Sequence, residues 1–159
     1  MTFCLGIKTQ EGLVGIADTR VTMGSECIVA KKLSSYQLEN GSLFLMTSGL
    51  RSVRDKVMTY FDEAIQQAHA PVDRLFKAAN LYSEHLRRVS TEDRAALNAA
   101  GLYLNMYTLM GGQFENDREH KLYMIYPEGN WGEIGEGTPY QTIGSRGDGE
   151  PGLGRTRTH

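Results

Sequence analysis

Thr2 stands where a threonine can act as both nucleophile and base. It directly follows the initiator methionine, which is commonly removed when the next residue is small. Removal would give Thr2 a free α-amino group beside its hydroxyl. An α-amino group titrates near ~8, so part of it is neutral at physiological pH and can take the hydroxyl proton directly or through water. The start of the chain therefore predicts a self-activating nucleophile, with a chance Met-Thr beginning as the alternative.

Two charged residues further along could support such a nucleophile. Asp18 ends the second predicted strand in the run GIADTR, and pairing in an N-terminal hairpin would bring it beside Thr2. Its carboxylate could orient a lysine, whereas a strand-end Asp that begins a turn is the alternative. Lys31 and Lys32 follow the apolar stretch 27–30, where a buried ammonium would lower the pKa of the Thr2 hydroxyl. Neighbouring side chains on a strand face opposite ways, so only one lysine should point inward; a solvated strand face is the alternative.

Short strands are the elements that would position these residues. Apolar runs bounded by turn residues predict strands at 2–8, 13–18, 34–38 and 42–47. The run 13–18 is apolar enough to predict burial on both of its faces. Asn40-Gly41 is the pair that best supplies the positive φ angles of a type I′ turn. The first part of the chain is therefore predicted to be mostly sheet.

Helical periodicity follows, and then strands return. Apolar residues at three- and four-residue spacing predict one helix from Val53 to Ala68 and a second, after Pro71, from Leu75 to Val89. Further strands are predicted at 102–110, 121–126, 131–134 and 140–143, with Gly111-Gly112 as a break. Blocks of strands and helices in this order predict an α+β layered domain.

These motifs together resemble the pattern of one family. N-terminal Thr2, Asp18 in GIADTR, Lys32 in AKKL and the run LMTSG before a helix stand in the order and near the spacing of proteasome β subunits, which are N-terminal-nucleophile (Ntn) hydrolases. The opening MTFCLGIKTQEGLVGIADTR is most similar to the bacterial ancestral β subunit (Anbu-type) peptidases. The later stretch GTPYQTIGSRGDGEP resembles the segment that starts their third helix.

The resemblance implies an activity and a set of site residues. It implies a threonine peptidase that hydrolyses peptide bonds, with Thr2 as nucleophile and, through its amine, as base. Asp18 would be the partner of Lys32, and Lys32 would lower the pKa of Thr2. Gly49 would lend its backbone N–H to the oxyanion hole, where one donor is worth roughly 3–4 kcal/mol. Ser145 matches the first serine of the proteasome GSG motif and would help to hold the terminal amine.

The resemblance also implies how the protein works with others. The substrate would be a peptide or an unfolded protein, and the chain would act as a homo-oligomer in a ring or a helical assembly. No metal ion or organic cofactor is expected, and the need for an unfoldase stays open. The alternative function is a catalytically silent structural or assembly subunit that retains Met1.

For the fold, the family implies a four-layer αββα sandwich. Residues 1–159 are interpreted as a single proteasome-type Ntn-hydrolase domain, incomplete at its C-terminus because the last helices and strands are missing. Gly152 and Gly154 replace residues that favour helix and core in the family. Without those elements, the outer face of the second sheet would expose apolar surface.

Composition argues against several other classes of protein. Seventeen Lys and Arg against 19 Asp and Glu give a formal charge of −2, which provides no surplus for nucleic acid or an anionic membrane. No run approaches the roughly 20 apolar residues of a membrane-spanning helix. Cys4 and Cys27 are the only cysteines, and the opening MTFCLGIKTQEGL has neither a positively charged start nor a long apolar run, so we expect a reduced, cytoplasmic protein. Cys4 and Cys27 lack neighbouring metal ligands and are expected to be buried structural cysteines. The glycine-rich stretch 144–154 lacks the Gly-Lys-Ser/Thr ending of a phosphate loop.

Overall fold

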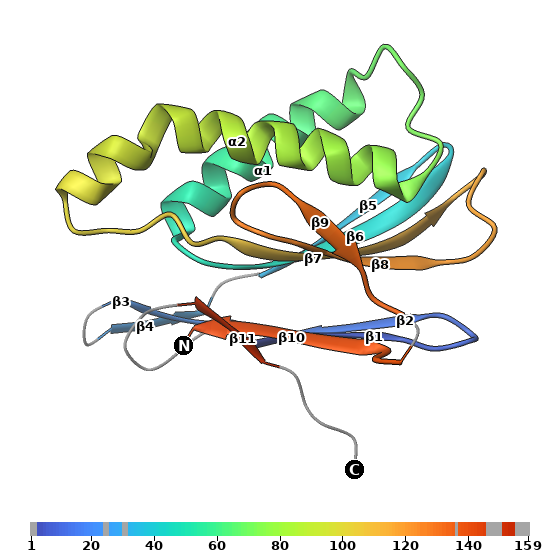
Figure 1. The fold of residues 1–159 in the computed structure, drawn as a ribbon, viewed down its shortest axis with the longest axis horizontal. Helices are drawn as coiled ribbons and strands as arrows, with labels where there is room; N and C mark the ends of the chain where they lie inside the picture. The colour runs from blue at the N-terminus through green and yellow to red at the C-terminus, as the bar shows by residue number, and fades with distance from the viewer. Residues whose placement is uncertain (1–2, 24–25, 30–31, 136, 146–150, 155–159) are drawn as a thin grey trace.

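A computed structural model describes residues 3–23, 26–29, 32–135, 137–145 and 151–154 (Figure 1). The elements of the N-terminal part are β1 (Phe3–Lys8), β2 (Leu13–Ala17), β3 (Arg20–Met23), β4 (Glu26–Val29), β5 (Leu33–Leu38) and β6 (Gly41–Ser48). They are followed by α1 (Arg51–Gln66), α2 (Leu75–Ala99), β7 (Tyr107–Phe114), β8 (Lys121–Ile125), β9 (Trp131–Glu133), β10 (Tyr140–Ser145) and β11 (Pro151–Gly154). The order is the predicted one of strands, helices and strands.

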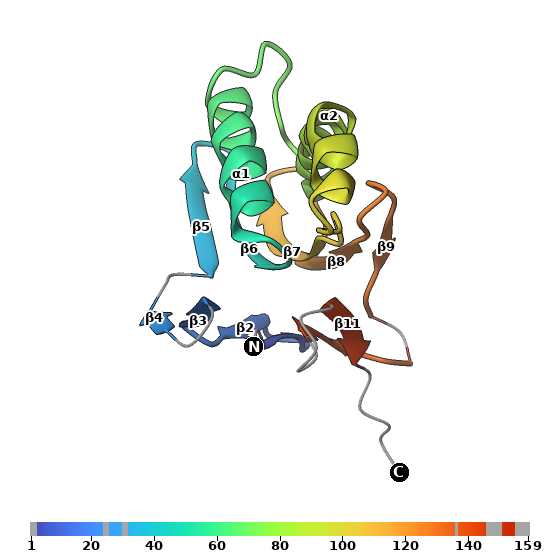
Figure 2. The same cartoon turned by 90° about the vertical axis from the view of Figure 1, so that its left-hand side faces the viewer.

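Three layers make up the described part of the chain. Helices α1 and α2 cover one face of a five-stranded sheet in the order β5-β6-β7-β8-β9, and a four-stranded sheet in the order β11-β10-β1-β2 lies against its other face (Figure 2). Strands β3 and β4 form a separate two-stranded hairpin. The observed architecture is α+β, with helices on one outer side, as the strand and helix pattern predicts.

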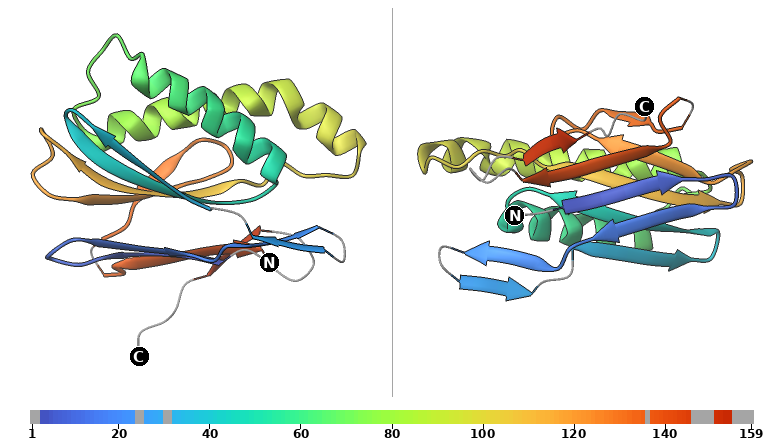
Figure 3. Two further views of the ribbon diagram at one scale, coloured as in Figure 1. Left: turned by 180° about the vertical axis from the view of Figure 1, so that it is seen from behind. Right: turned by 90° about the horizontal axis from the view of Figure 1, so that it is seen from below.

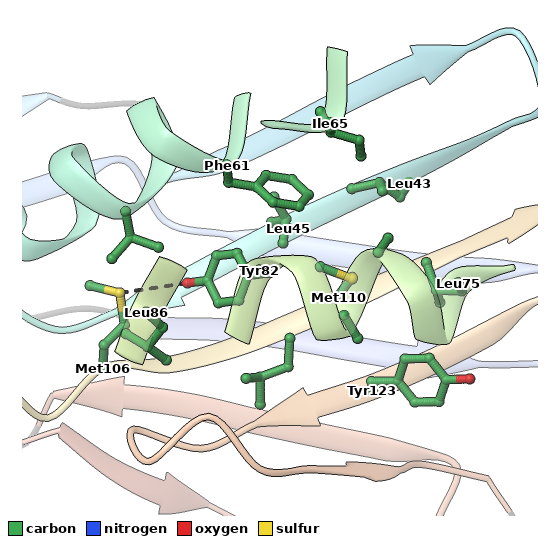
Figure 4. Close-up of a cluster of buried hydrophobic side chains, with 14 of the residues drawn as sticks. Leu43, Leu45, Phe61, Ile65, Leu75, Tyr82, Leu86, Met106, Met110 and Tyr123 are labelled. Carbon is green, nitrogen blue, oxygen red and sulfur yellow. Dashed lines mark hydrogen bonds between the residues drawn. The ribbon is translucent and has the colours of Figure 1, made fainter. Parts of the chain in front are cut away.

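The larger core lies between the helices and the five-stranded sheet (Figure 4). Each helix contributes an apolar stripe at three- and four-residue spacing, as amphipathic helices do. The ring of Phe61 packs edge-on against Tyr36 of β5 at 5.5 Å and against Tyr82 of α2 at 5.6 Å, measured between ring centroids. The hydroxyl of Tyr82 is buried and lies 2.6 Å from Oγ1 of Thr108 on β7. These contacts fix α1 and α2 on the sheet.

A second core fills the space between the two sheets. Its buried members are Cys4, Met46, Leu109, Leu122, Met124, Ile134 and Ile143. Along β6, Leu43 and Leu45 belong to the helix-side core whereas Met46 belongs to this one, because successive side chains of a strand point to opposite faces. Side chains at even positions of β6 therefore face the four-stranded sheet.

The outer face of the four-stranded sheet exposes apolar side chains. Phe3, Val14 and Ile16 are 48%, 45% and 51% exposed. Seen from below, no described helix covers this sheet (Figure 3, right). Burial of residues 13–18 on both faces is therefore a wrong prediction for β2, because only one face of this sheet packs against described residues. The apolar outer surface that the sequence predicts is observed.

Three local predictions are also wrong. No described residue other than glycine has a positive φ, so Asn40 does not adopt the type I′ conformation, and Gly41, with φ +156°, carries the unusual angle alone. Gly111 and Gly112 lie inside β7 and not in a turn, because they pair with β6 and β8. Glycine suits position 111 because a Cβ there would come within 2.6 Å of the Phe44 ring. The strand that was expected to start at residue 102 begins at Tyr107.

Pro151, the last residue of the stretch that resembles the start of a helix, begins a short strand. Residues 151–154 form β11, which pairs with β10 through partners that include Ile143↔Leu153 and Ser145↔Pro151. Gly152 and Gly154 disfavour helix, and Pro151 stands at the first position of the strand, where its missing N–H is tolerated.

Neither described helix combines the length and apolar content that a membrane-spanning helix needs.

Candidate active site

The N-terminal hairpin brings Asp18 to the beginning of β1. Strands β1 and β2 pair so that Cys4 lies opposite Ala17, which places Asp18 next to Phe3. The backbone N–H of Asp18 donates to the Phe3 carbonyl at 3.0 Å, and the Phe3 N–H donates to Oδ1 of Asp18 at 3.0 Å. The Asp18 carboxylate is thus fixed beside the residue that follows Thr2.

Lys32 joins this carboxylate from the segment that enters β5. Its Nζ donates to Oδ1 of Asp18 at 2.8 Å, and only 7% of the lysine side chain is exposed. About a third of the Asp18 side chain, 34%, remains exposed. The structure therefore brings together the carboxylate and the ammonium that the sequence singles out, with the cation on the buried side. Lys31 lies outside the described residues.

The surroundings of Asp18 favour the charged form of its carboxyl. Burial alone would raise the pKa of Asp18, but the hydrogen bonds from Lys32 and from the Phe3 N–H and the positive charge of Lys32 outweigh it. The pKa of the Asp18 carboxyl is therefore lowered, and the group is an anion at neutral pH. An anion here can hold the lysine side chain in place.

Gly49 occupies the bend between β6 and α1. Its φ of +154° favours glycine, and a Cβ there would come within 3.1 Å of the Asn105 carbonyl oxygen and of the Met106 Cα. The residue is exposed and directly follows the buried Ser48. Its backbone is therefore open to a ligand at the end of the sheet where β6 stops.

The two remaining predicted site residues are less fully defined. Thr2 lies outside the described residues. Ser145 ends β10, and its neighbour Gly144 pairs with Phe3, so the Ser145 backbone lies at the same end of the four-stranded sheet as Asp18. The structure thus brings Asp18 and Lys32 into contact and puts Ser145 at their end of the sheet.

Cys4 is close to this pair but is not suited to be a nucleophile. Its side chain is fully buried, and its Sγ donates a weak hydrogen bond to the Thr47 carbonyl at 3.9 Å. Burial, and secondarily the negative charge of Asp18, raise the pKa of the Cys4 thiol to about 12. The thiol stays protonated at neutral pH, which agrees with a structural cysteine. The side chain of Cys27 is not among those described.

Sequence reasoning did not find the cavity at the opposite end of the sandwich. A cavity of about 460 Å³ opens between β2 and the β5–β6 edge, and its lining includes Leu13, Gln37, Phe44, Gly111 and His120. The strand registers place it near the β1–β2 turn, at the far end of the strands from Asp18. No periodic pattern marks it, because two sheets contribute its walls. Among the described residues, no three His, Cys, Asp or Glu side chains gather closely enough to hold a metal ion.

The layered fold and the Asp18–Lys32 pair define a protein of the Ntn-hydrolase class. Residues 2–149 match the sequence profile of the family described as proteasome subunit, and the chain therefore belongs to the proteasome family. No curated protein matches the sequence.

Solved structures agree with this assignment. The chain is similar to Anbu, the ancestral beta-subunit, from Yersinia bercovieri, with 25% identity over 90% of this chain and 60% of that one, at a TM-score of 0.78. The helical assembly of the Anbu complex from Pseudomonas aeruginosa gives 25% identity, 90% and 61% coverage, and a TM-score of 0.80. Anbu from Hyphomicrobium sp. strain MC1 gives 26% identity, 90% and 60% coverage, and 0.75. The chain spans about 60% of the length of these relatives.

Proposed function

We propose that this protein is a threonine peptidase in which Thr2, freed by removal of Met1, hydrolyses amide bonds of peptides or unfolded proteins. The observation that carries the proposal is the contact between the buried Lys32 ammonium and Asp18, formed beside Phe3. A buried cation that is held by a carboxylate next to the start of the chain serves an N-terminal nucleophile better than it serves stability, since burying an ion pair often adds little to folding.

Each step of the reaction has a group available for it. The Thr2 hydroxyl would attack the carbonyl carbon while its proton moves to the α-amine, and the positive charge of Lys32 would lower the pKa of the hydroxyl. The Gly49 N–H would donate to the oxyanion. The protonated amine would then give its proton to the departing amine, and water would hydrolyse the resulting ester. Asp18 would hold the Lys32 side chain in place.

We further propose that the chain acts as a homo-oligomer. The similar protein from Pseudomonas aeruginosa is described as a helical assembly. A helical assembly equally suits the second candidate function, a silent assembly subunit, if Met1 is retained.

Hydrolysis of fluorogenic peptides by variants tests the proposal. Purified protein with a free Thr2 should cleave a peptide amide, Thr2→Ala should abolish cleavage, and Thr2→Ser should keep part of it. Lys32→Met should lose at least a hundredfold in rate while it stays folded by circular dichroism. Cleavage that survives Thr2→Ala would assign the activity to another residue or to a contaminating protease.

A further inference from the structure

A buried hydroxyl that makes no hydrogen bond with the described residues lies at the same end of the sandwich as the Asp18–Lys32 pair. Ser48 is the last residue of β6 and is 1% exposed, and within the described ranges its Oγ has no hydrogen-bond partner. A buried polar group normally has a partner, because burial without one is costly. Ser48 is small, and alanine would fill its place without this cost. Of the two buried serines that make no side-chain hydrogen bond among the described residues, Ser48 lies at the end of the sandwich that holds Asp18 and Lys32, whereas Ser83 lies on α2.

The strand register shows which way Ser48 points. Side chains alternate along β6, so Ser48 shares its face with Met46, which packs in the core between the two sheets. Its cross-strand partner on β7, Tyr107, packs against the same core. The hydroxyl of Ser48 is therefore directed into the inter-sheet layer, toward the four-stranded sheet, where that layer reaches its end.

One strand of the opposite sheet that reaches the end of β6 is β1. Cys4 contacts the carbonyl of Thr47, the residue before Ser48, so the beginning of β1 and the end of β6 lie against each other. The thiol of Cys4 also lies within the electrostatic influence of Asp18 and Lys32. Ser48 is thus one residue from a direct contact with β1, on the side where the chain leads back to Thr2.

We propose that Ser48 is a positioning residue for the terminal nucleophile and that its hydroxyl accepts a hydrogen bond from the α-ammonium of Thr2 once Met1 has been removed. This inference rests on the proposed function. When the Thr2 hydroxyl attacks, its proton passes to the amine, and the ammonium that results is the species that Ser48 stabilises. The bond would supply the partner that Ser48 lacks and would fix the direction of the base.

The proposed hydrogen bond determines the direction in which Ser48 shifts the pKa of the Thr2 α-amine. A hydrogen bond that is accepted from an ammonium favours the charged form and raises its pKa. Ser48→Ala should therefore lower the pKa of the Thr2 α-amine by about one unit, in the range expected for one hydrogen bond to a charged group. It should also slow acylation of Thr2 by a β-lactone about tenfold or more, because the base is no longer held in place.

Ser83 provides the matched control. It is also a buried serine, 2% exposed, whose Oγ has no partner, but it lies on α2 in the helix layer, beyond the five-stranded sheet. Ser83→Ala removes the same atom from a comparable environment. It should leave the amine pKa and the β-lactone rate unchanged within about twofold. Ser48→Thr, a single variant that keeps the hydroxyl, should have the wild-type pKa at the Thr2 α-amine.

The experiment uses the full chain, produced behind a cleavable leader that exposes Thr2. The pKa of the α-amine is measured from the pH dependence of its acetylation by trace acetic anhydride, and the folded state of each variant is checked by thermal melting. A lowered pKa in Ser48→Ala, and not in Ser83→Ala, supports the inference. Equal pKa values in wild type, Ser48→Ala and Ser83→Ala overturn it. Absence of a β-lactone adduct on wild-type Thr2 would instead overturn the proposed function, independently of the amine titration.

Discussion

Nζ of Lys32 lies 2.8 Å from Oδ1 of Asp18, with the lysine buried and the aspartate a third exposed. This asymmetry affects stability, because the free-energy penalty of losing the partner differs between the two charged groups. A carboxylate that is partly exposed can be hydrated again, whereas a buried ammonium cannot. Removing the anion should therefore lower the stability of the folded protein more than removing the cation.

Asp18→Asn should destabilise the protein more than Lys32→Met. The first change leaves the ammonium buried without a carboxylate and should cost about 2–3 kcal/mol, below the full penalty of a deeply buried pair because Asp18 is partly solvated. The second removes the buried charge and should stay within about 1 kcal/mol of wild type. Urea denaturation of both variants measures the difference. Equal losses would show that Lys32 is hydrated in solution.

The stability contributed by Asp18 should depend on pH in one direction. Its pKa is lowered in the folded state, so its contribution is present above the unfolded value of about 3.9 and is lost as the pH falls through the folded value. The difference in unfolding free energy between wild type and Asp18→Asn should therefore narrow below about pH 4. Other carboxyls with lowered pKa values, such as Glu119, are present in both proteins, so their contributions cancel in the difference between the two unfolding free energies. A gap that is constant from pH 7 to pH 2.5 would contradict the contact.

Cys4 should be unreactive in the folded protein. Its buried thiol has a pKa of about 12, so almost no thiolate is present at pH 8. Iodoacetamide should leave the peptide that contains Cys4 unmodified in native buffer and alkylate it fully in urea, as read by mass spectrometry. Rapid alkylation of Cys4 in folded protein would reopen the question of a cysteine nucleophile.

The hydrogen bond between Tyr82 and Thr108 should show strong coupling. Tyr82→Phe leaves the buried Thr108 hydroxyl without this partner and should cost about 1–3 kcal/mol. The double variant Tyr82→Phe, Thr108→Val should cost less than the sum of the two single changes, because no polar group is then stranded. Thermal or urea unfolding of the four proteins gives the coupling energy. Additive losses would mean that the bond at 2.6 Å is absent in solution.

Local pattern and alternation were sufficient to predict much of this structure. The helical periodicity predicted α1 and α2, and hairpin pairing predicted that Asp18 returns to the start of β1. Alternation along a strand predicted that one lysine of the pair points inward, and Lys32 is buried. Each of these conclusions needed only neighbouring residues or one tight turn.

The features that were missed depend on contacts between distant segments. Gly111 and Gly112 look like a turn in the sequence, but they lie inside β7, where the ring of Phe44 occupies the space that a Cβ at Gly111 would need. The pairing of β10 with β1 joins segments that lie far apart in the sequence, and no local sequence pattern predicts it. Ser48 is likewise an ordinary serine in the sequence, and only the packed structure shows that its buried hydroxyl makes no hydrogen bond with the part of the chain that is described.

The central claim is that Thr2 is a free and activated nucleophile. Intact mass and N-terminal sequencing of the natively expressed protein, followed on the same sample by labelling with a threonine-reactive epoxyketone or β-lactone, test it most directly. The account predicts that Met1 is absent and that a single adduct forms on Thr2, lost in Lys32→Met. Retained Met1, or a free Thr2 that stays unreactive in folded protein, would contradict it and favour the silent assembly subunit.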